Sequence, residues 1–215
     1  MCGIAGYIGD QKIESSVVTK TLTLMKNRGP DYKNFYQTEI NKAQILLLHS
    51  RLSIIDLESR SNQPFLKDDL VIVFNGEIYN HLEIRKILES ELSKKIKWRG
   101  QSDTETILCA IDFFGIERAL EISVGMFAFA LWDKTKKSLT LARDRVGEKP
   151  LYYSFIKESF IYSSIILSSS GRSWVVSFGR LFFCILWFIH ITSCFSLAVF
   201  SWSALALSES DHVQR

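Results

Sequence analysis

The apolar residues of the chain fall into short runs of strand length and one longer stretch of helical spacing, separated by polar turns. Seven runs predict strands, at 2–8, 44–48, 70–74, 127–132, 138–142, 150–155 and 159–162. Residues 13–26 place apolar side chains at helical spacing, and the segment Arg28-Gly29-Pro30-Asp31 ends that predicted helix.

Two further helices are predicted from capping patterns in the middle of the chain. Asn80 with Glu83 begins a helix that extends to about residue 93, and Ser102 with Glu105 precedes a helix over 103–114. The apolar side of the first of these helices is expected to carry Leu82, Ile87 and Leu88. Because strands surround grouped helices instead of alternating with them, we expect an α+β layered domain and not a doubly wound parallel sheet.

The composition of the chain changes sharply after about residue 167. Residues 168–215 contain no Lys, Pro or Asn, and no Asp, Glu, Lys or Arg occurs between Arg180 and Glu209. We therefore divide the chain into a domain over 2–163 and an atypical apolar tail over 164–215. The two parts are expected to be different kinds of sequence.

Two interpretations of the tail stay open. Residues 181–208 exceed the ~20 apolar residues that a bilayer span needs, and Arg172 and Arg180 before them would suit a cytoplasmic amino-terminal domain. The many serines and His190 in mid-span argue against a membrane anchor. A shifted reading frame or a truncated gene would also produce such a tail, and we favour that interpretation over membrane contact through 181–208.

Charge and cysteine usage exclude several classes of function. With 26 basic and 23 acidic residues, the chain gives no sign of a nucleic-acid partner. Its four cysteines have no paired short spacing and its four histidines are scattered, so neither a disulfide framework nor a metal site is indicated. No signal-peptide pattern opens the chain. We expect a cytoplasmic protein with a working thiol.

Cys2 is the strongest candidate for chemistry. If Met1 is removed, Cys2 carries a free α-amine with an ordinary pKa near ~8 beside a thiol with an ordinary pKa near ~8.5. One residue then supplies both nucleophile and base, as does a threonine that is activated by its own terminal amine. The alternative is that Cys2 is an ordinary small residue near a frayed end.

A cysteine nucleophile needs a carbonyl substrate and donors for the oxyanion that forms. The apolar run 70–74 leads directly into Asn75, Gly76 and Glu77. A side-chain amide beside a glycine N–H at a strand end can donate two hydrogen bonds to an oxyanion. Asn-Gly after such a run is also a strong hairpin signal, so a plain turn stays open as an alternative.

Charged residues near these segments could hold an amino-acid ligand. Arg51 stands in an otherwise uncharged stretch over 48–55 and is suited to bidentate capture of a carboxylate, although an internal ion pair with Asp56 would also satisfy it. Asp103 is either a helix cap or, with Glu77, a partner for an ammonium group. Charges placed in this way would hold the amino-acid end of glutamine, and its side-chain carbonyl would then face Cys2.

Eight segments then occur in register along the chain: 1–6, 28–31, 49–57, 62–65, 74–81, 102–105, 125–130 and 142–153. Together they closely resemble the glutaminase domain of glutamine-hydrolysing asparagine synthetases, a class II glutamine amidotransferase. The resemblance covers roughly residues 2–163. Eight motifs in order make it specific.

The resemblance implies a four-layer αββα sandwich of the N-terminal-nucleophile hydrolase type. It implies that Cys2 hydrolyses glutamine to glutamate and ammonia through a thioester, with Asn75 and Gly76 as the oxyanion hole. The residues that would bind glutamine are Arg51, Leu52, Ser53, Ile54, Ile55, Asn75, Gly76, Glu77 and Asp103. Asp31 and its neighbours are expected to shape the pocket and not to act in the chemistry.

The resemblance stops before the second domain of that family, which activates aspartate with ATP through a Ser-Gly-Gly-x-Asp-Ser loop. Residues 168–173 are only a superficial echo of that loop. We therefore expect no cofactor or metal in this chain, with ATP and Mg²⁺ belonging only to the complete family enzyme. A separate synthetase domain or chain would use the ammonia. The alternative is a catalytically idle or membrane-tethered module that binds glutamine without turnover.

Overall fold

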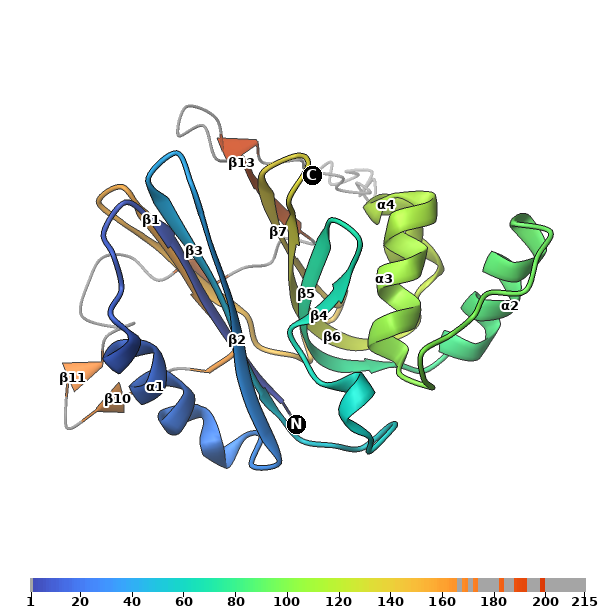
Figure 1. Ribbon diagram of the computed structural model, residues 1–215, viewed down its shortest axis with the longest axis horizontal. Coiled ribbons are helices and arrows are strands. Elements are labelled where there is room, and N and C mark those ends of the chain that lie inside the picture. The colour runs from blue at the N-terminus through green and yellow to red at the C-terminus, as the bar shows by residue number, and fades with distance from the viewer. Residues whose placement is uncertain are drawn as a thin grey trace, which may run out of the picture.

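Two antiparallel sheets stack face to face, with helices on both outer faces (Figure 1). The computed structural model describes residues 2–165 throughout, and beyond them the backbone of five short strand segments at 168–169, 172–173, 182–183, 188–192 and 198–199. Within the described residues, α1 lies on the outer face of the first sheet, and α2, α3 and α4 lie on the outer side of the second. The expected αββα sandwich is confirmed.

The helices are α1 (Ser15–Leu24), α2 (His81–Glu91), α3 (Asp103–Phe114) and α4 (Ile116–Ile122), with 3₁₀ turns at Met25–Asn27 and Ser59–Ser61. The first sheet has the order β12-β8-β9-β1-β3-β2, formed by Phe182–Phe183, Tyr152–Ile156, Ser159–Ser163, Gly3–Gly9, Ala43–Arg51 and Tyr32–Ile40. The second has the order β14-β13-β7-β6-β5-β4, formed by Ala198–Val199, Phe188–Thr192, Ser138–Arg143, Gly125–Asp133, Leu70–Ile78 and Phe65–Lys67. Strands β10 (Ser168–Ser169) and β11 (Arg172–Ser173) pair separately.

Strand β5 shows how alternation builds two cores from one sheet. Val71 and Val73 pack between the sheets, whereas Ile72 and Phe74 pack under the helices, and all four are at most 2% exposed. Successive side chains of a strand point to opposite faces, so an unbroken apolar run is buried on both. The site-bearing part of β5 therefore continues from a rigid, doubly covered strand.

Helix α3 is buried along most of its length, from Asp103 through Ile111. Its apolar residues pack on β5 and on neighbouring helices, in the same cluster as Phe74 and Ile78. A helix buried on most sides takes its position from tertiary packing. This packing fixes the amino-terminal end of α3, and with it Asp103, against the edge of β5.

The predicted strands and helices are confirmed, with bounds that shift by a few residues, but β2, β4 and α4 were not predicted. Strand β2 is an edge strand whose residues are at most half-buried, because it pairs only with β3. Its sequence therefore lacks an apolar run. The last four predicted strands are divided between the sheets, because β6 and β7 belong to the second sheet and β8 and β9 to the first.

Both capping predictions were partly wrong. Ser102 does cap α3, through a hydrogen bond of 3.2 Å from the Thr104 N–H, but the Glu105 carboxylate accepts from the Arg99 and Gly100 N–H groups instead of closing a box. The Asn80 side chain makes no cap and bonds the backbone of Ile122 and Val124. In both cases backbone groups outside the helix outcompete the local motif.

The predicted apolar side of α2 was correct for Leu88 and wrong for Leu82 and Ile87. Leu82 is 60% exposed and Ile87 is 41% exposed, whereas Ile84 and Leu88 are fully buried. Positions 84 and 88 are one helical turn apart and form the face that packs on the core.

Beyond Ile165, the tail is described only at its short strands. Strand β12 pairs with β8, and β13 pairs with β7. Apart from these strands, the stretch 181–208, for which membrane contact was the less favoured interpretation, lies outside the described residues. Over the part of the chain that the structure describes, no helix has both the length and the apolar character needed to cross a bilayer.

Candidate active site

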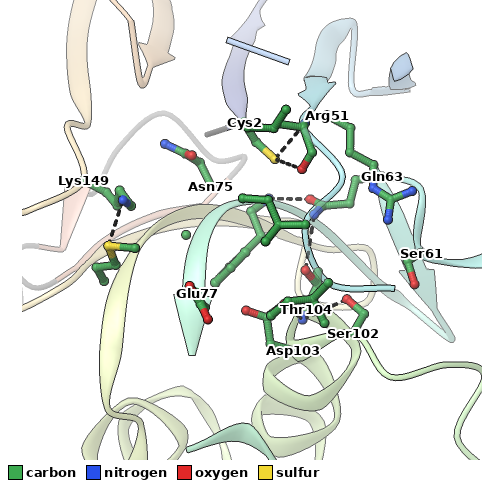
Figure 2. A pocket seen from close by; sticks show the side chains of 16 residues that line it. Cys2, Arg51, Ser61, Gln63, Asn75, Glu77, Ser102, Asp103, Thr104 and Lys149 are labelled. Atoms are coloured by element: carbon green, nitrogen blue, oxygen red, sulfur yellow. Dashed lines mark hydrogen bonds between the residues drawn. The ribbon is translucent and has the colours of Figure 1, made fainter. Parts of the chain in front are cut away.

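Four segments that are distant in the sequence meet around one pocket (Figure 2). Cys2 precedes β1, the loop 52–55 follows β3, Asn75 to Glu77 lie on β5, and Asp103 begins α3. All of the predicted site residues except Ser53 line this pocket. The backbone N–H of Ser53 instead donates to Asp31 Oδ2 at 2.7 Å, so Asp31 holds the loop that carries Leu52 and Ile54.

Cys2 is held against the loop that follows β3. Strand pairing sets Gly3 opposite Ser50, and the Cys2 Sγ accepts a hydrogen bond of 3.4 Å from the Leu52 N–H. Burial raises the pKa of the Cys2 thiol, and the Leu52 N–H and the charge of Arg51 oppose that effect. A thiol with a raised pKa needs a base to become a nucleophile at neutral pH.

Asn75 supplies a side-chain amide to the pocket. The residue is fully buried, and neither its Nδ2 nor its Oδ1 has a hydrogen-bond partner within the described residues. A buried amide without partners costs free energy unless a ligand or water satisfies it. The amide is therefore a prepared donor at the pocket wall.

The predicted strand end and the alternative of a hairpin turn were both wrong for Asn75-Gly76. Strand β5 continues to Ile78, and its pairing with β6 extends through Gly125. Asn75 and Gly76 thus lie inside a strand. A Cβ on Gly76 would lie 2.2 Å from the carbonyl oxygen of Met126, so the close approach of β6 requires glycine.

The backbone N–H of Gly76 faces away from β6. Its partner Phe127 donates its N–H to Asp144 Oδ2 at 3.2 Å and accepts from the Asp144 N–H at 2.8 Å, on the opposite side of β6. Because the N–H and C=O of one strand residue point the same way, Gly76 and Phe127 form a non-hydrogen-bonded pair. The Gly76 N–H therefore points to the free edge of β5.

This edge is completed by side chains instead of a strand. Residues Phe65–Lys67 of β4 pair only with Leu70–Ile72 of β5. Farther along, the Phe74 N–H donates to Gln63 Oε1 at 2.6 Å, and the Ile78 N–H donates to Asp103 Oδ2 at 2.9 Å. The Gly76 N–H lies between these two and has no partner among the described residues. It is a second donor beside Asn75.

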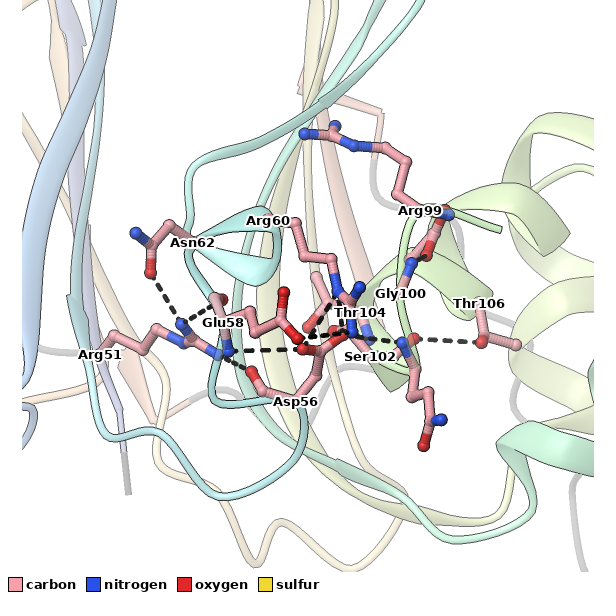
Figure 3. A network of polar contacts seen from close by, with 12 residues as sticks. Arg51, Asp56, Glu58, Arg60, Asn62, Arg99, Gly100, Ser102, Thr104 and Thr106 are labelled. Atoms are coloured by element: carbon pink, nitrogen blue, oxygen red, sulfur yellow. Dashed lines mark hydrogen bonds and ion pairs between the residues drawn. The ribbon is translucent and has the colours of Figure 1, made fainter. Parts of the chain in front are cut away.

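Arg51 brings a positive charge to the opposite wall (Figure 3). Its Nη1 donates to Asn62 Oδ1 at 2.7 Å and to the Glu58 carbonyl at 3.2 Å, and its Nη2 donates to the Asp56 carbonyl. Within the described chain, no carboxylate pairs with Arg51, so the predicted alternative of an ion pair with Asp56 was wrong. A buried guanidinium without a counter-ion favours an anionic ligand.

The Asp56 carboxylate holds this loop to the start of α3. It accepts from the Gln101 N–H at 2.8 Å and from Arg60 Nε at 3.1 Å. Burial raises the pKa of Asp56, but hydrogen bonds from Gln101 and Arg60 outweigh it and lower the pKa to about 2. The carboxylate is therefore charged at neutral pH, and the Arg51 loop is anchored.

Two carboxylates lie on the other side of the pocket, at Glu77 and Asp103. Burial raises the pKa of Asp103 to about 6, hydrogen bonds from the Ile78 and Thr104 N–H groups oppose this, and the charge of Glu77 adds to it. Neither carboxylate pairs with a cationic side chain among the residues described. An ammonium group of a ligand would relieve this concentration of negative charge.

The pocket therefore combines a thiol, two donors, a cation and two carboxylates. The sequence model of the glutamine amidotransferase domain matches residues 1–171. This chain belongs to the glutamine amidotransferase domain family.

Curated relatives are similar to this amidotransferase domain over a part of their length. Asparagine synthetase [glutamine-hydrolyzing] 2 of Bacillus subtilis is 35% identical over 175 residues, which are 78% of this chain and 22% of that protein. Asparagine synthetase [glutamine-hydrolyzing] 1 of Arabidopsis thaliana is 33% identical, over 76% of this chain and 27% of that protein. Amidase chyE of Penicillium rubens is 34% identical, over 78% of this chain and 26% of that protein. The chain spans about a quarter of the length of these three relatives.

The fold has solved counterparts. The structure of glutamine phosphoribosylpyrophosphate amidotransferase from Bacillus subtilis, with ADP and GMP, superimposes with a TM-score of 0.62 at 18% identity, over 76% of this chain and 42% of that one. The likeness supports the sandwich architecture. The resemblance to asparagine synthetases that the motifs carry is confirmed by the curated relatives.

Sequence reasoning missed several residues that line the pocket of this amidotransferase domain. Gln63 and Lys149 both lie in recognised motifs, but no role was predicted for either. Gln63 completes the edge of β5, and the buried Lys149 Nζ lies 2.9 Å from Met126 Sδ. Their membership in motifs was the available signal. In the described residues, no group of three or more His, Cys, Asp or Glu side chains could hold a metal ion.

Proposed function

We propose that this chain hydrolyses glutamine to glutamate and ammonia through a thioester on Cys2. The observation that carries the proposal is the placing of the Cys2 thiol in one pocket with two unpartnered donors, the Asn75 amide and the Gly76 N–H. Donors that stay unsatisfied without ligand are suited to charge that develops only during reaction. An idle binding module would have no need of them.

The charges of the pocket indicate how glutamine would lie. Arg51 uses three of its N–H groups on the loop, which leaves two for the α-carboxylate, together with the backbone of Leu52 to Ile55. Glu77 and Asp103 would bind the α-ammonium group. The side-chain amide of glutamine then extends toward Cys2 and the two donors.

The chemistry would proceed in two halves. The α-amine of Cys2, freed by removal of Met1, takes the thiol proton while Sγ attacks the amide carbon, and the oxyanion accepts hydrogen bonds from Asn75 and Gly76. The protonated amine returns its proton to the leaving nitrogen, ammonia departs and a γ-glutamyl thioester remains. Water, deprotonated by the same amine, attacks the thioester, releases glutamate and restores the thiol.

The fate of the ammonia is a further part of the proposal. By analogy with the asparagine synthetase relatives, a separate synthetase domain or chain would use it to aminate activated aspartate, with ATP and Mg²⁺ bound there. We infer that hydrolysis itself needs no cofactor, because thiol, amine and water account for every proton and bond. A cytoplasmic setting would supply glutamine and keep Cys2 reduced.

An assay with two readouts tests the proposal. Intact mass shows whether Met1 is removed, and glutamate and ammonia are measured after incubation with glutamine. We expect both products in equal amounts from the processed chain and none from Cys2→Ala. Folded, processed protein that binds glutamine without forming glutamate would contradict turnover and favour the idle module.

A further inference from the structure

His49 joins the two sheets directly behind the proposed oxyanion hole. It lies on β3 of the first sheet, is fully buried, and its Nε2 lies 3.2 Å from the Phe74 carbonyl oxygen on β5 of the second sheet. In the first sheet, His49 is paired with Ile4, two residues after Cys2. This contact therefore links the strand that carries the nucleophile to the strand that carries Asn75.

The proton on His49 can be assigned from its partner. A carbonyl oxygen only accepts, so Nε2 must carry the hydrogen, and Nδ1 is then an unprotonated nitrogen that has no partner among the described residues. Burial lowers the pKa of His49 to about 3, the bond to Phe74 opposes this, and the charge of Arg51 adds to it. The ring stays neutral at working pH and is not a proton carrier.

The Phe74 carbonyl belongs to the same peptide plane as the Asn75 nitrogen. A hydrogen bond on that carbonyl therefore fixes the direction in which the Asn75 Cα, and its side chain, leave the strand. Gln63 holds the preceding N–H of Phe74, and Gln63 is itself held by Thr104 Oγ1 at 3.3 Å. The Asn75 amide has no partner of its own, so its aim depends on this backbone.

We propose that His49 is a positioning residue, which holds the Phe74 peptide so that the Asn75 amide and the Gly76 N–H point at the oxyanion. The role rests on the proposed glutamine hydrolysis. A displacement of about 1 Å in a catalytic group can cost about 10²-fold in rate, so the anchor of a donor strand is expected to affect turnover strongly. A histidine that merely fills space would affect stability alone.

Two replacements separate these roles. His49→Phe keeps a ring but removes the donor, and His49→Gln retains a side-chain N–H at similar reach. We expect His49→Phe to lower kcat about 10–100-fold with KM changed by less than about threefold, and His49→Gln to recover most of the loss. Similar kcat values for the two variants would overturn the proposal. Thermal unfolding of each variant shows the structural cost separately.

A double-mutant cycle with Asn75→Ala tests the path of the effect. If His49 acts through Asn75, His49→Phe should change kcat less than about twofold in the Asn75→Ala background. If the kcat losses of the two single variants multiply in the double variant, His49 acts independently of Asn75, and the proposal is overturned. Alkylation of Cys2 by iodoacetamide forms no oxyanion, so its rate should be the same in His49→Phe as in the unaltered chain. An alkylation rate that falls as much as kcat would mean that His49 acts on the thiol, which would overturn the proposal.

A last measurement does not depend on turnover. The side-chain NH₂ resonances of Asn75 should shift in His49→Phe and return toward their original positions in His49→Gln. Unchanged resonances would overturn the positioning role. If the unaltered chain does not hydrolyse glutamine, the proposed function fails on its own, and the resonances still decide whether His49 orients Asn75.

Discussion

Asp103 Oδ2 accepts a hydrogen bond of 2.9 Å from the backbone N–H of Ile78. The carboxylate that faces the proposed ammonium site is thus the group that closes the edge of β5 two residues beyond Gly76. The Asp103 side chain therefore serves both the proposed binding of the ligand and the hydrogen bonding of β5. Substitution of Asp103 is for this reason expected to affect both ligand affinity and the geometry of the donor strand.

The raised pKa of Asp103 predicts a pH dependence. As pH falls through about 6, Asp103 gains a proton and loses its attraction for an ammonium group, so kcat/KM for glutamine should fall. Stability has the opposite sign: the folded state binds this proton more tightly than the unfolded state, so the contribution of Asp103 to stability is largest below its ordinary pKa and decreases as pH rises through about 6.

Steady-state kinetics from pH 5 to 8 would check this prediction, with Asp103→Asn as the matched variant. The variant should bind glutamine weakly at every pH and lack the acidic limb near 6. An unchanged limb in Asp103→Asn would assign it to another group.

Cys2 is predicted to be the labelled nucleophile. Cys2→Ala, or a chain with an uncleavable residue before Cys2, should lose turnover and labelling by a glutamine-like electrophile. Cys109 cannot substitute, because it is 8% exposed and burial raises its pKa to about 11. Peptide mapping of the labelled protein identifies the site, and normal labelling of Cys2→Ala would refute the assignment.

Arg51→Ala and Asn75→Ala should fail in different ways. Arg51 would hold the part of glutamine that does not react, so its loss should mainly raise KM. Asn75 would act on charge that exists only in the transition state, so its loss should lower kcat by ~10²–10³. Michaelis–Menten parameters for both variants provide the test. An Asn75→Ala variant with normal kcat and weaker binding would exclude the oxyanion role.

Gly76→Ala should damage both the fold and the site. The added Cβ would lie 2.2 Å from the Met126 carbonyl, and such overpacking costs ~1–3 kcal/mol in the free energy of unfolding. Gly115 is the matched control: its φ of +81° and ψ of 166° suit only glycine, but nothing lies within 4 Å of an added Cβ, so Gly115→Ala should cost a similar ~1–3 kcal/mol and keep turnover. Denaturant unfolding and the glutaminase assay together separate the two. Equal turnover in both variants would contradict the model of the strand edge.

The domain boundary can be tested with two shortened forms. The Ile4 N–H donates to Ser164 Oγ and the Ser164 N–H donates to the Ile4 carbonyl, both at 2.9 Å, and Ile165 packs against the cluster under α1. A form that ends at Ile165 should keep glutaminase activity, whereas one that ends at Tyr162 should lose stability beside Cys2. Neither form, nor the full chain, is expected to make asparagine from aspartate, ATP and glutamine. Asparagine from the full chain alone would contradict that expectation.

Local signals predicted the parts of this fold that local contacts decide. The 103–114 helix was predicted with its observed bounds because Ser102 caps it through the adjacent Thr104. The end of β5 was misjudged because Asn75-Gly76 has the sequence of a turn, and only the pairing with β6, some fifty residues later, keeps it extended. The role of Gln63 depends on the same kind of distant contact, so composition and spacing cannot reveal it.

The candidate site shows the same division. Residue types and motif order were enough to select Cys2, Arg51 and Asp103, which the structure brings to one pocket, and the chemistry assigned to them stays a proposal. The partners of Arg51 could not be predicted, because hydrogen bonds to the backbone carbonyls of Asp56 and Glu58 produce no recognisable sequence pattern. These backbone contacts decide whether the charge of Arg51 stays available to a ligand.

The central position of β1 also has a consequence for biosynthesis. This strand pairs on one side with β3 and on the other with β9, which ends at Ser163. Synthesis runs from the amino terminus, yet β1, which follows Cys2 directly, gains its second neighbour only after about 160 residues have emerged, and such non-local pairing forms slowly. The nascent amino terminus is therefore open to an aminopeptidase for most of synthesis. The proposed removal of Met1 would in this way precede closure of the sandwich, an order in time that follows from topology alone.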